Sequence, residues 1–125
     1  MNKKLIPAFL VVMLLSGVAW AEELIDQERL ADAIYLAEGG KAAKVAYGIL
    51  SVKVKDKAEA RRVCLRTINN NLARWQWARS QGDQRGFIAY LGAKYAPLGA
   101  GNDPRGLNRA WVSNVTRLYN QALGL

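Results

Sequence analysis

The sequence predicts a mainly α-helical domain of about four helices, with an irregular loop or a short hairpin after the first helix. Apolar residues recur every three or four positions in four segments, which is the spacing that places them on one face of an α-helix. Glycine, proline and asparagine separate these segments and indicate where the helices end. The single cysteine, Cys64, allows no disulfide within the chain, so the fold depends on the packing of these helices.

The first 21 residues predict an export signal that is removed. Residues 1–4 form a short basic head, and residues 5–18 form an apolar run that is short for a membrane span. Residues 19–21 then give the small-x-small pattern that signal peptidase accepts. We therefore expect a signal peptide over residues 1–21, one domain over residues 22–125, no stable membrane span after cleavage, and a periplasmic or secreted bacterial protein. An uncleaved anchor is the alternative.

The first helix is expected over Ile25–Ala37, where apolar residues share one face and acidic residues near the start suit a helix N-terminus. The pair Gly39-Gly40 predicts its end. Residues 41–54 predict a loop with a short strand or hairpin, because apolar and basic residues alternate over residues 52–54.

The second helix is expected to begin with a capping box at residues 56–59 and to run to about Ser80. Its buried face is predicted to contain Cys64, Ile68, Leu72 and Trp75. Three asparagines at positions 69–71 lie inside this helix although asparagine is a poor helix former. We expect them to face solvent or to cap a neighbouring loop.

A short third helix is expected over Phe87–Tyr95 and is ended by Pro97. Residues 98–106 predict a loop, because glycine, proline, asparagine and aspartate dominate there. Asn108 is expected to cap a last helix. The buried face of that helix is predicted to contain Trp111, Val115, Leu118 and Ala122.

The chain is basic, with 18 lysines and arginines against 10 acidic residues and a net charge of +8. An exported basic protein meets anionic cell-wall polymers and membrane surfaces, so we expect an acidic partner and no nucleic acid. The sequence has no histidine, which excludes serine–histidine and cysteine–histidine nucleophile systems. A metal site would need carboxylates alone, and no spacing supports one, so we expect neither a metal nor a cofactor.

Leu30, Ile34 and Glu38 are spaced by four residues, so Glu38 continues the row that the first helix turns toward the core. Desolvation disfavours a charged carboxylate and favours its protonated form. A neutral carboxylic acid near neutral pH can donate a proton to a leaving oxygen. The pattern therefore indicates a sugar-cleaving acid. The alternative is an exposed glutamate at a helix end.

These features resemble the lysozyme-like superfamily, in particular goose-type lysozymes and lytic transglycosylases. In that group a glutamate at a helix end, as Glu38 is here, is followed after a loop by a Gly-Leu-Met-Gln type segment, and residues 48–51 (Gly-Ile-Leu-Ser) take that place. Three later segments resemble the tail of small secreted or phage-encoded relatives: residues 95–97 (Tyr-Ala-Pro), 102–104 (Asn-Asp-Pro) and 107–111 (Leu-Asn-x-x-Trp).

The resemblance implies that Glu38 protonates the glycosidic oxygen between N-acetylmuramic acid and N-acetylglucosamine in peptidoglycan glycan strands, and then serves as base. Removing the proton of the muramic C6 hydroxyl gives a 1,6-anhydro sugar, and activating water gives hydrolysis. A two-carboxylate mechanism would use Asp56 or Asp103, and we favour the single-glutamate mechanism. The substrate-binding residues that the resemblance implies are Tyr47, Gly48, Ser51 and Tyr95.

The chain departs from the family pattern at two positions, with Gly39 where the family has serine and Ser51 where it has glutamine. These differences affect substrate positioning more than acid chemistry. They support a second hypothesis, in which the same scaffold binds peptidoglycan or another cell-wall protein without cleaving glycan. A third hypothesis is a cationic protein that acts on membranes or acidic polymers, in which Glu38 has no role.

Several of these residues also have a structural interpretation. Tyr95 keeps the spacing of a buried stripe, and Gly48 can serve only to make a turn. Trp75 and Trp111 keep the register of core residues and are interpreted as structural, whereas Trp77 lies off that register and is the candidate for a surface contact.

Overall fold

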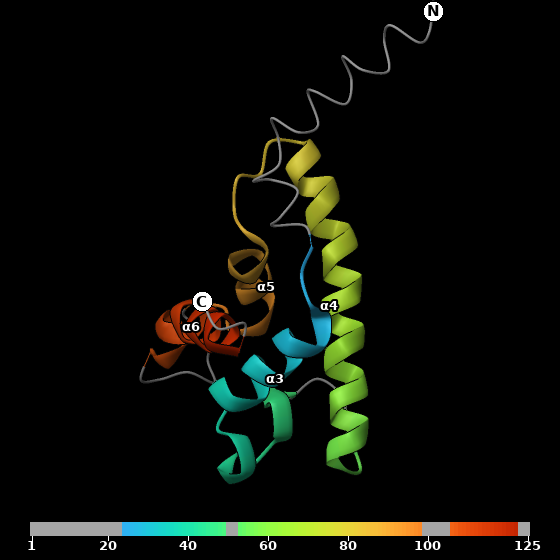
Figure 1. Ribbon diagram of the computed structural model, residues 1–125, viewed down its shortest axis with the longest axis vertical. Coiled ribbons are helices and arrows are strands. Elements are labelled where there is room, and N and C mark those ends of the chain that lie inside the picture. The colour runs from blue at the N-terminus through green and yellow to red at the C-terminus, as the bar shows by residue number, and fades with distance from the viewer. Residues whose placement is uncertain (1–23, 50–52, 99–105, 123–125) are drawn as a thin grey trace, which may run out of the picture.

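The protein is mainly α-helical, as predicted, with four α-helices and three short 3₁₀ helices in the part that the structure describes (Figure 1). This computed structural model describes residues 24–49, 53–98 and 106–122. The predicted signal peptide, Ser51 and Asp103 lie outside the described residues. Within the described ranges, no helix is both long enough and apolar enough to cross a membrane.

The first helix, α3 (Gln27–Ala37), begins two residues later than expected because Asp26 is its N-cap and accepts a hydrogen bond from the Arg29 amide at 3.1 Å. Its buried residues are Leu30, Ala31, Ala33 and Ile34. Glu38 is the C-cap, and Gly39 then turns the chain with φ 110°. The helix therefore ends at the carboxyl group of interest.

The segment after α3 contains two 3₁₀ helices, η1 (Gly40–Ala42) and η2 (Ala46–Gly48). The described residues between 41 and 54 form no strand, so the irregular loop is confirmed, whereas the strand or hairpin is absent from residues 41–49 and 53–54. Tyr47 and Gly48 both have positive φ, at 62° and 65°. A strand requires extended φ, so the turn at these two residues cannot belong to one. Of the alternation at residues 52–54 from which the strand was predicted, residue 52 lies outside the described residues, and residues 53 and 54 are not in a strand.

The long helix α4 (Lys57–Ser80) begins and ends where the sequence predicted. Asp56 caps it by accepting a hydrogen bond from the Glu59 amide at 2.8 Å. Trp75 is fully buried, and its indole N–H donates to the Arg85 carbonyl at 2.8 Å, which holds the loop that follows α4 against the helix.

The three asparagines of α4 divide between surface and core. Asn69 and Asn70 are exposed as expected, whereas Asn71 is 4 % exposed. Its side-chain Nδ2 donates to the Thr67 carbonyl one turn earlier at 2.8 Å, and Oδ1 has no hydrogen-bond partner among the described residues. Asn71 thus bonds to its own helix, and the expected contact with solvent or with a neighbouring loop is wrong for this residue.

The remaining helices are α5 (Phe87–Tyr95), η3 (Leu107–Ala110) and α6 (Trp111–Ala122). Asn108 does not cap α6, because it lies inside η3 and its side-chain Nδ2 donates to the Pro97 carbonyl at 2.9 Å. This bond ties the start of η3 to the end of α5. The capping prediction was wrong because the chain first makes a 3₁₀ turn.

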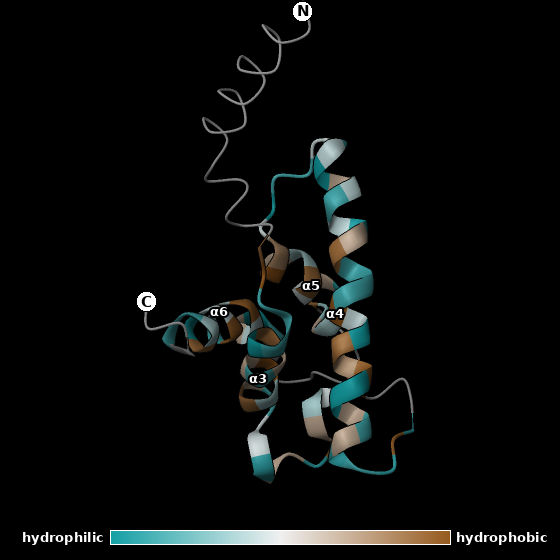
Figure 2. Cartoon of the chain, turned by 45° about the vertical axis from the view of Figure 1, so that its right-hand side comes forward, coloured by the Kyte–Doolittle hydropathy of each residue, from teal (hydrophilic) through white to brown (hydrophobic). Residues whose placement is uncertain are grey.

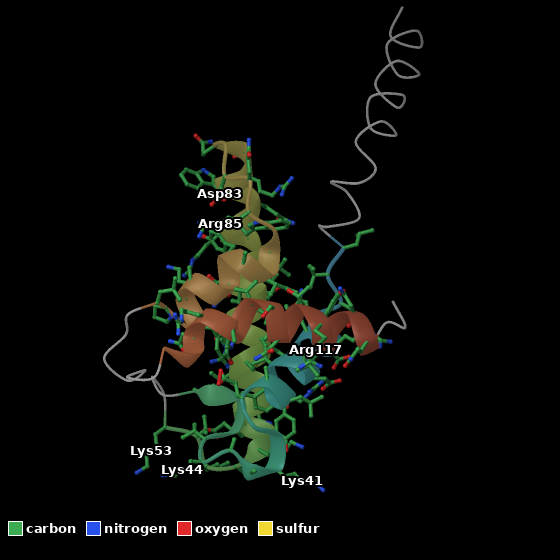
Figure 3. The ribbon with its side chains drawn as sticks, turned by 90° about the vertical axis from the view of Figure 1, so that its left-hand side faces the viewer. Lys41, Lys44, Lys53, Asp83, Arg85 and Arg117 are labelled. Atoms are coloured by element: carbon green, nitrogen blue, oxygen red, sulfur yellow. The ribbon has the colours of Figure 1, made fainter. Side chains whose placement is uncertain are left out.

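Helix α6 packs against α3 and α5, and it runs crosswise to α4 (Figures 1 and 3). Figure 2 shows hydrophobic residues of α3, α5 and α6 on the sides that face the middle of the molecule, while the outward side of α4 is mostly hydrophilic. The largest fully buried side chains are Trp75, Tyr47, Leu30, Ile34, Ile68, Leu91 and Val115. The core therefore joins the first and last described helices, and the end of α3 lies beside the start of α6.

Candidate active site

Glu38 lies at the end of α3 with its carboxyl group directed toward α6. Its amide donates to the Ile34 carbonyl at 2.9 Å, so the backbone is still held by the last turn of the helix. Its side-chain Oε2 accepts a hydrogen bond from the indole Nε1 of Trp111 at 3.2 Å. Among the described residues, Glu38 forms no ion pair. The carboxyl group is therefore half-buried and held by a neutral donor.

Gly48 forms the wall on another side of this carboxyl group. A Cβ atom at position 48 would lie 2.6 Å from both Cδ and Oε2 of Glu38, and 2.9 Å from Oε1. Gly48 also has φ 65°, a conformation that side-chain-bearing residues rarely adopt. The sequence left two readings of this glycine, a ligand approach or a simple turn. The structure adds a third, because the missing side chain leaves space for Glu38.

Trp111 is placed against Glu38 by packing with α5. Its ring stacks on Tyr95 with centroids 5.3 Å apart and planes at 22°. Gly92 makes this approach close, since a Cβ atom there would lie 2.7 Å from Val112 Cγ2 and 3.2 Å from Trp111 Cε3. Trp111 is 6 % exposed, in agreement with its core register, and it also supplies the donor to Glu38.

The environment favours the protonated form of Glu38. Burial raises the pKa of this carboxyl group above its ordinary value of 4.5, and the hydrogen bond from Trp111 offsets only part of the rise. The sequence predicted this direction from the row that Glu38 shares with Leu30 and Ile34. A carboxylic acid that stays protonated toward neutral pH can act as a general acid.

Tyr47 supports the site from the core and does not contact solvent. Its side chain is 1 % exposed and packs on Tyr35 with ring centroids 5.1 Å apart. Its hydroxyl accepts a hydrogen bond from Arg61 Nη1 at 3.2 Å, and the same nitrogen donates to Asp32 Oδ1 at 2.7 Å. A side chain this buried cannot reach a glycan. Tyr47 is therefore corrected from substrate binding to anchoring the η2 turn.

Tyr95 lies between Trp111 and the buried Cys64. Its hydroxyl donates to Cys64 Sγ at 3.5 Å, and its ring is half-buried. Burial raises the pKa of both the Tyr95 hydroxyl and the Cys64 thiol, so both groups are neutral. Tyr95 therefore stacks on Trp111 and helps to position its ring, in agreement with the structural interpretation of this residue.

The other candidate residues lie away from this arrangement. Asp56 has its Oδ1 in the cap of α4. Trp77 is 68 % exposed on α4, where it is available for a surface contact as the register indicated. In the described ranges, no three or more histidine, cysteine, aspartate or glutamate residues are grouped so that they could hold a metal ion.

Trp111 is the site residue that sequence reasoning missed. A buried indole N–H needs a hydrogen-bond acceptor, and a carboxyl group at the end of a buried row needs a donor. These two needs, taken together, are the signal in the sequence that could have paired Trp111 with Glu38. They are 73 positions apart in the sequence, and pairing them needs the packing of α6 on α3.

Comparison of the chain with protein-family models, with curated proteins and with solved structures finds no match in any of the three.

Proposed function

We propose that the protein cleaves the glycan strands of peptidoglycan, as a lytic transglycosylase or a muramidase, with Glu38 as general acid and base. The observation that carries the proposal is the half-buried carboxyl group at the end of α3, which is bonded by Trp111 and has a raised pKa. A raised pKa keeps such a group protonated to higher pH than an ordinary glutamate, and a protonated carboxyl group can transfer its proton to a leaving oxygen. The lysozyme-like motif at residues 48–51 supports glycan as the substrate.

In the proposed reaction Glu38 protonates the oxygen between N-acetylmuramic acid and N-acetylglucosamine while positive charge develops on the departing sugar. The resulting carboxylate then takes a proton from the muramic C6 hydroxyl or from water. The hydrogen bond from Trp111 stabilises that carboxylate between the two steps. We propose the single-glutamate mechanism; of the two alternative carboxylates, Asp56 caps α4, and Asp103 lies outside the described residues. The basic amino-terminal segment supports export to the periplasm or cell exterior.

A second candidate function is binding of peptidoglycan, or of another cell-wall protein, without cleavage. It is favoured by the position of two surface hollows. One lies between η2 and the start of α4, and the other lies between α5 and the η3–α6 segment. Glu38 lines neither of them. A ligand seated in either hollow would need to extend beyond it to reach the carboxyl group.

The test compares wild-type protein, Glu38→Gln and Glu28→Gln, each expressed as the full chain and purified after export. Glu28 has a side chain that is 77 % exposed and lies 4.0 Å from Arg61 Nη2, so Glu28→Gln makes the same change of carboxyl group to amide at a solvated position. Each protein is incubated with peptidoglycan sacculi, and released fragments are identified by mass spectrometry.

Anhydro-muropeptides from wild type and Glu28→Gln, and none from folded Glu38→Gln, are expected for a lytic transglycosylase. Reducing ends with the same dependence on Glu38 indicate a muramidase. If folded wild-type protein releases nothing between acidic and neutral pH while it still sediments with sacculi, the binding function replaces the enzyme.

A further inference from the structure

Three lysines surround a hollow on the side of η2 that faces the start of α4. The hollow has a volume of about 360 Å³. Its basic rim is formed by Lys44, Lys53 and Lys55, and its apolar floor by Val45, Ala46, Ile49 and Val54. Figure 3 shows Lys44 and Lys53 at the same end of the molecule as Lys41 and at the opposite end from Asp83 and Arg85.

The three rim lysines carry charge that the described part of the protein does not balance. None of them forms an ion pair or hydrogen bond with a described residue, whereas Arg61 and Arg85 each pair with an aspartate at 2.7 Å. Asp56 is the carboxylate among the described lining residues, and its Oδ1 is bonded to the Glu59 amide. The N-terminal end of the 24-residue helix α4 adds further positive potential. The hollow is therefore suited to an anion.

The floor of the hollow is continuous with the hydrophobic core. Ile49 is 8 % exposed and belongs to the core, and Val54 packs against that core. An apolar floor below a basic rim suits a ligand that has short aliphatic groups as well as carboxylates. A simple inorganic anion would use the rim and leave the floor without a partner.

The hollow and the candidate acid share one turn of the chain. Val45, Ala46 and Ile49 line the hollow, while Gly48, in the same turn, contacts the Glu38 carboxyl group. A glycan with its scissile oxygen at Glu38 would therefore lie beside the turn whose other residues line the hollow. Groups that branch from the sugar next to the scissile bond are the parts of the substrate that would extend toward the hollow.

We propose that this hollow binds the peptide stem of peptidoglycan, with Lys44, Lys53 and Lys55 meeting its carboxylates and the apolar floor meeting its short aliphatic side chains. The stem branches from the lactyl group of N-acetylmuramic acid, next to the bond that Glu38 is proposed to cleave. This assignment rests on the proposed function, which gives the glycan strand as substrate. It names the peptide stem as the group on that strand that the hollow recognises.

The test measures dissociation constants by titration calorimetry in the Glu38→Gln background, which prevents turnover. The first variant carries Lys44→Gln, Lys53→Gln and Lys55→Gln. The control carries Arg74→Gln, Lys94→Gln and Arg117→Gln, three exposed positions outside the hollow, so net charge falls equally. Circular dichroism establishes that each variant is folded.

Four probes separate the sources of binding: the disaccharide with its peptide stem, the same disaccharide without the stem, the free stem peptide, and inorganic phosphate. We expect the stem-bearing disaccharide to bind the lysine variant about tenfold more weakly than its parent, and the control variant within about twofold of its parent, because each exposed charge contact contributes only modestly to affinity. The disaccharide without the stem should not distinguish the variants.

Equal affinity for the two disaccharides, or an equal loss in both triple variants, would overturn the proposal. Lysine-dependent binding of phosphate without binding of the free stem peptide would overturn it as well, since the hollow would then be a site for another anion. Lysine-dependent binding of the free stem peptide, together with no cleavage of sacculi by wild-type protein, would keep the stem site and reject the glycan-cleaving function.

Discussion

Replacing Gly48 by alanine tests whether the close wall beside Glu38 sets the position of its carboxyl group. The added methyl group would lie 2.6 Å from Glu38 Cδ and Oε2, which is closer than nonbonded atoms approach. The carboxyl group must therefore move, and we expect this movement to break the 3.2 Å hydrogen bond from Trp111. A displacement of about 1 Å in a catalytic group lowers activity by about 100-fold.

The effect on stability has two parts. A positive φ costs a residue with a side chain about 1 kcal/mol, and loss of a hydrogen bond to a neutral carboxyl group costs about 1 kcal/mol. We expect Gly48→Ala to lower the free energy of unfolding by about 2 kcal/mol. Urea denaturation followed by circular dichroism gives this quantity, and release of muropeptides from sacculi gives activity.

Gly40→Ala is the matched control. Gly40 has φ 57°, close to that of Gly48, but a Cβ atom there would meet only side-chain carbons of Leu36 and Tyr35 at 3.8 Å. This variant should lose about 1 kcal/mol and keep most of its activity. If Gly40→Ala and Gly48→Ala have the same stability and the same activity, the contact with Glu38 has no consequence beyond backbone strain and the reasoning is refuted.

Two further predictions concern the pKa of Glu38. Trp111→Phe keeps a ring that can stack on Tyr95 and removes the hydrogen-bond donor that lowers the pKa of Glu38. The pKa of Glu38 should therefore rise further, and the alkaline limb of the pH–activity profile should move to higher pH. An unchanged titration of the Glu38 carboxyl group in carbon-13 NMR would contradict this. In the second, a raised pKa in the folded state means that Glu38 stabilises the fold most in its protonated form, and that this stabilisation is lost as pH rises through the folded pKa. The free energy of unfolding of Glu38→Gln relative to wild type should therefore increase as pH rises above about 4.5, the ordinary value, and a difference that stays constant with pH would contradict this.

The helices could be predicted because their signals are local. Asp56 caps the long helix three residues before the amide it bonds, and the apolar spacing after it keeps one face through to Trp75. Asn108 and Asn71 were harder, since each has a side chain suited to several backbone partners and the sequence does not rank them. Asn71 donates to the Thr67 carbonyl and Asn108 to the Pro97 carbonyl, and both pairings depend on the local backbone conformation.

The candidate site was predictable only in part. The buried row predicted the position of Glu38 and the direction of its pKa, because both follow from the geometry of one helix. The donor from Trp111 and the contact with Gly48 depend on packing between distant segments. Tyr47 is buried in a conformation with positive φ, which the sequence gives no reason to expect at a tyrosine.

The hydrogen bond between Glu38 and Trp111 joins the first described helix to the last. A chain in which α6 has not packed on α3 lacks this bond, because only the tertiary fold brings its donor and its acceptor together. The surroundings that raise the pKa of the Glu38 carboxyl group therefore form when the two helices meet and not when the residue is synthesised.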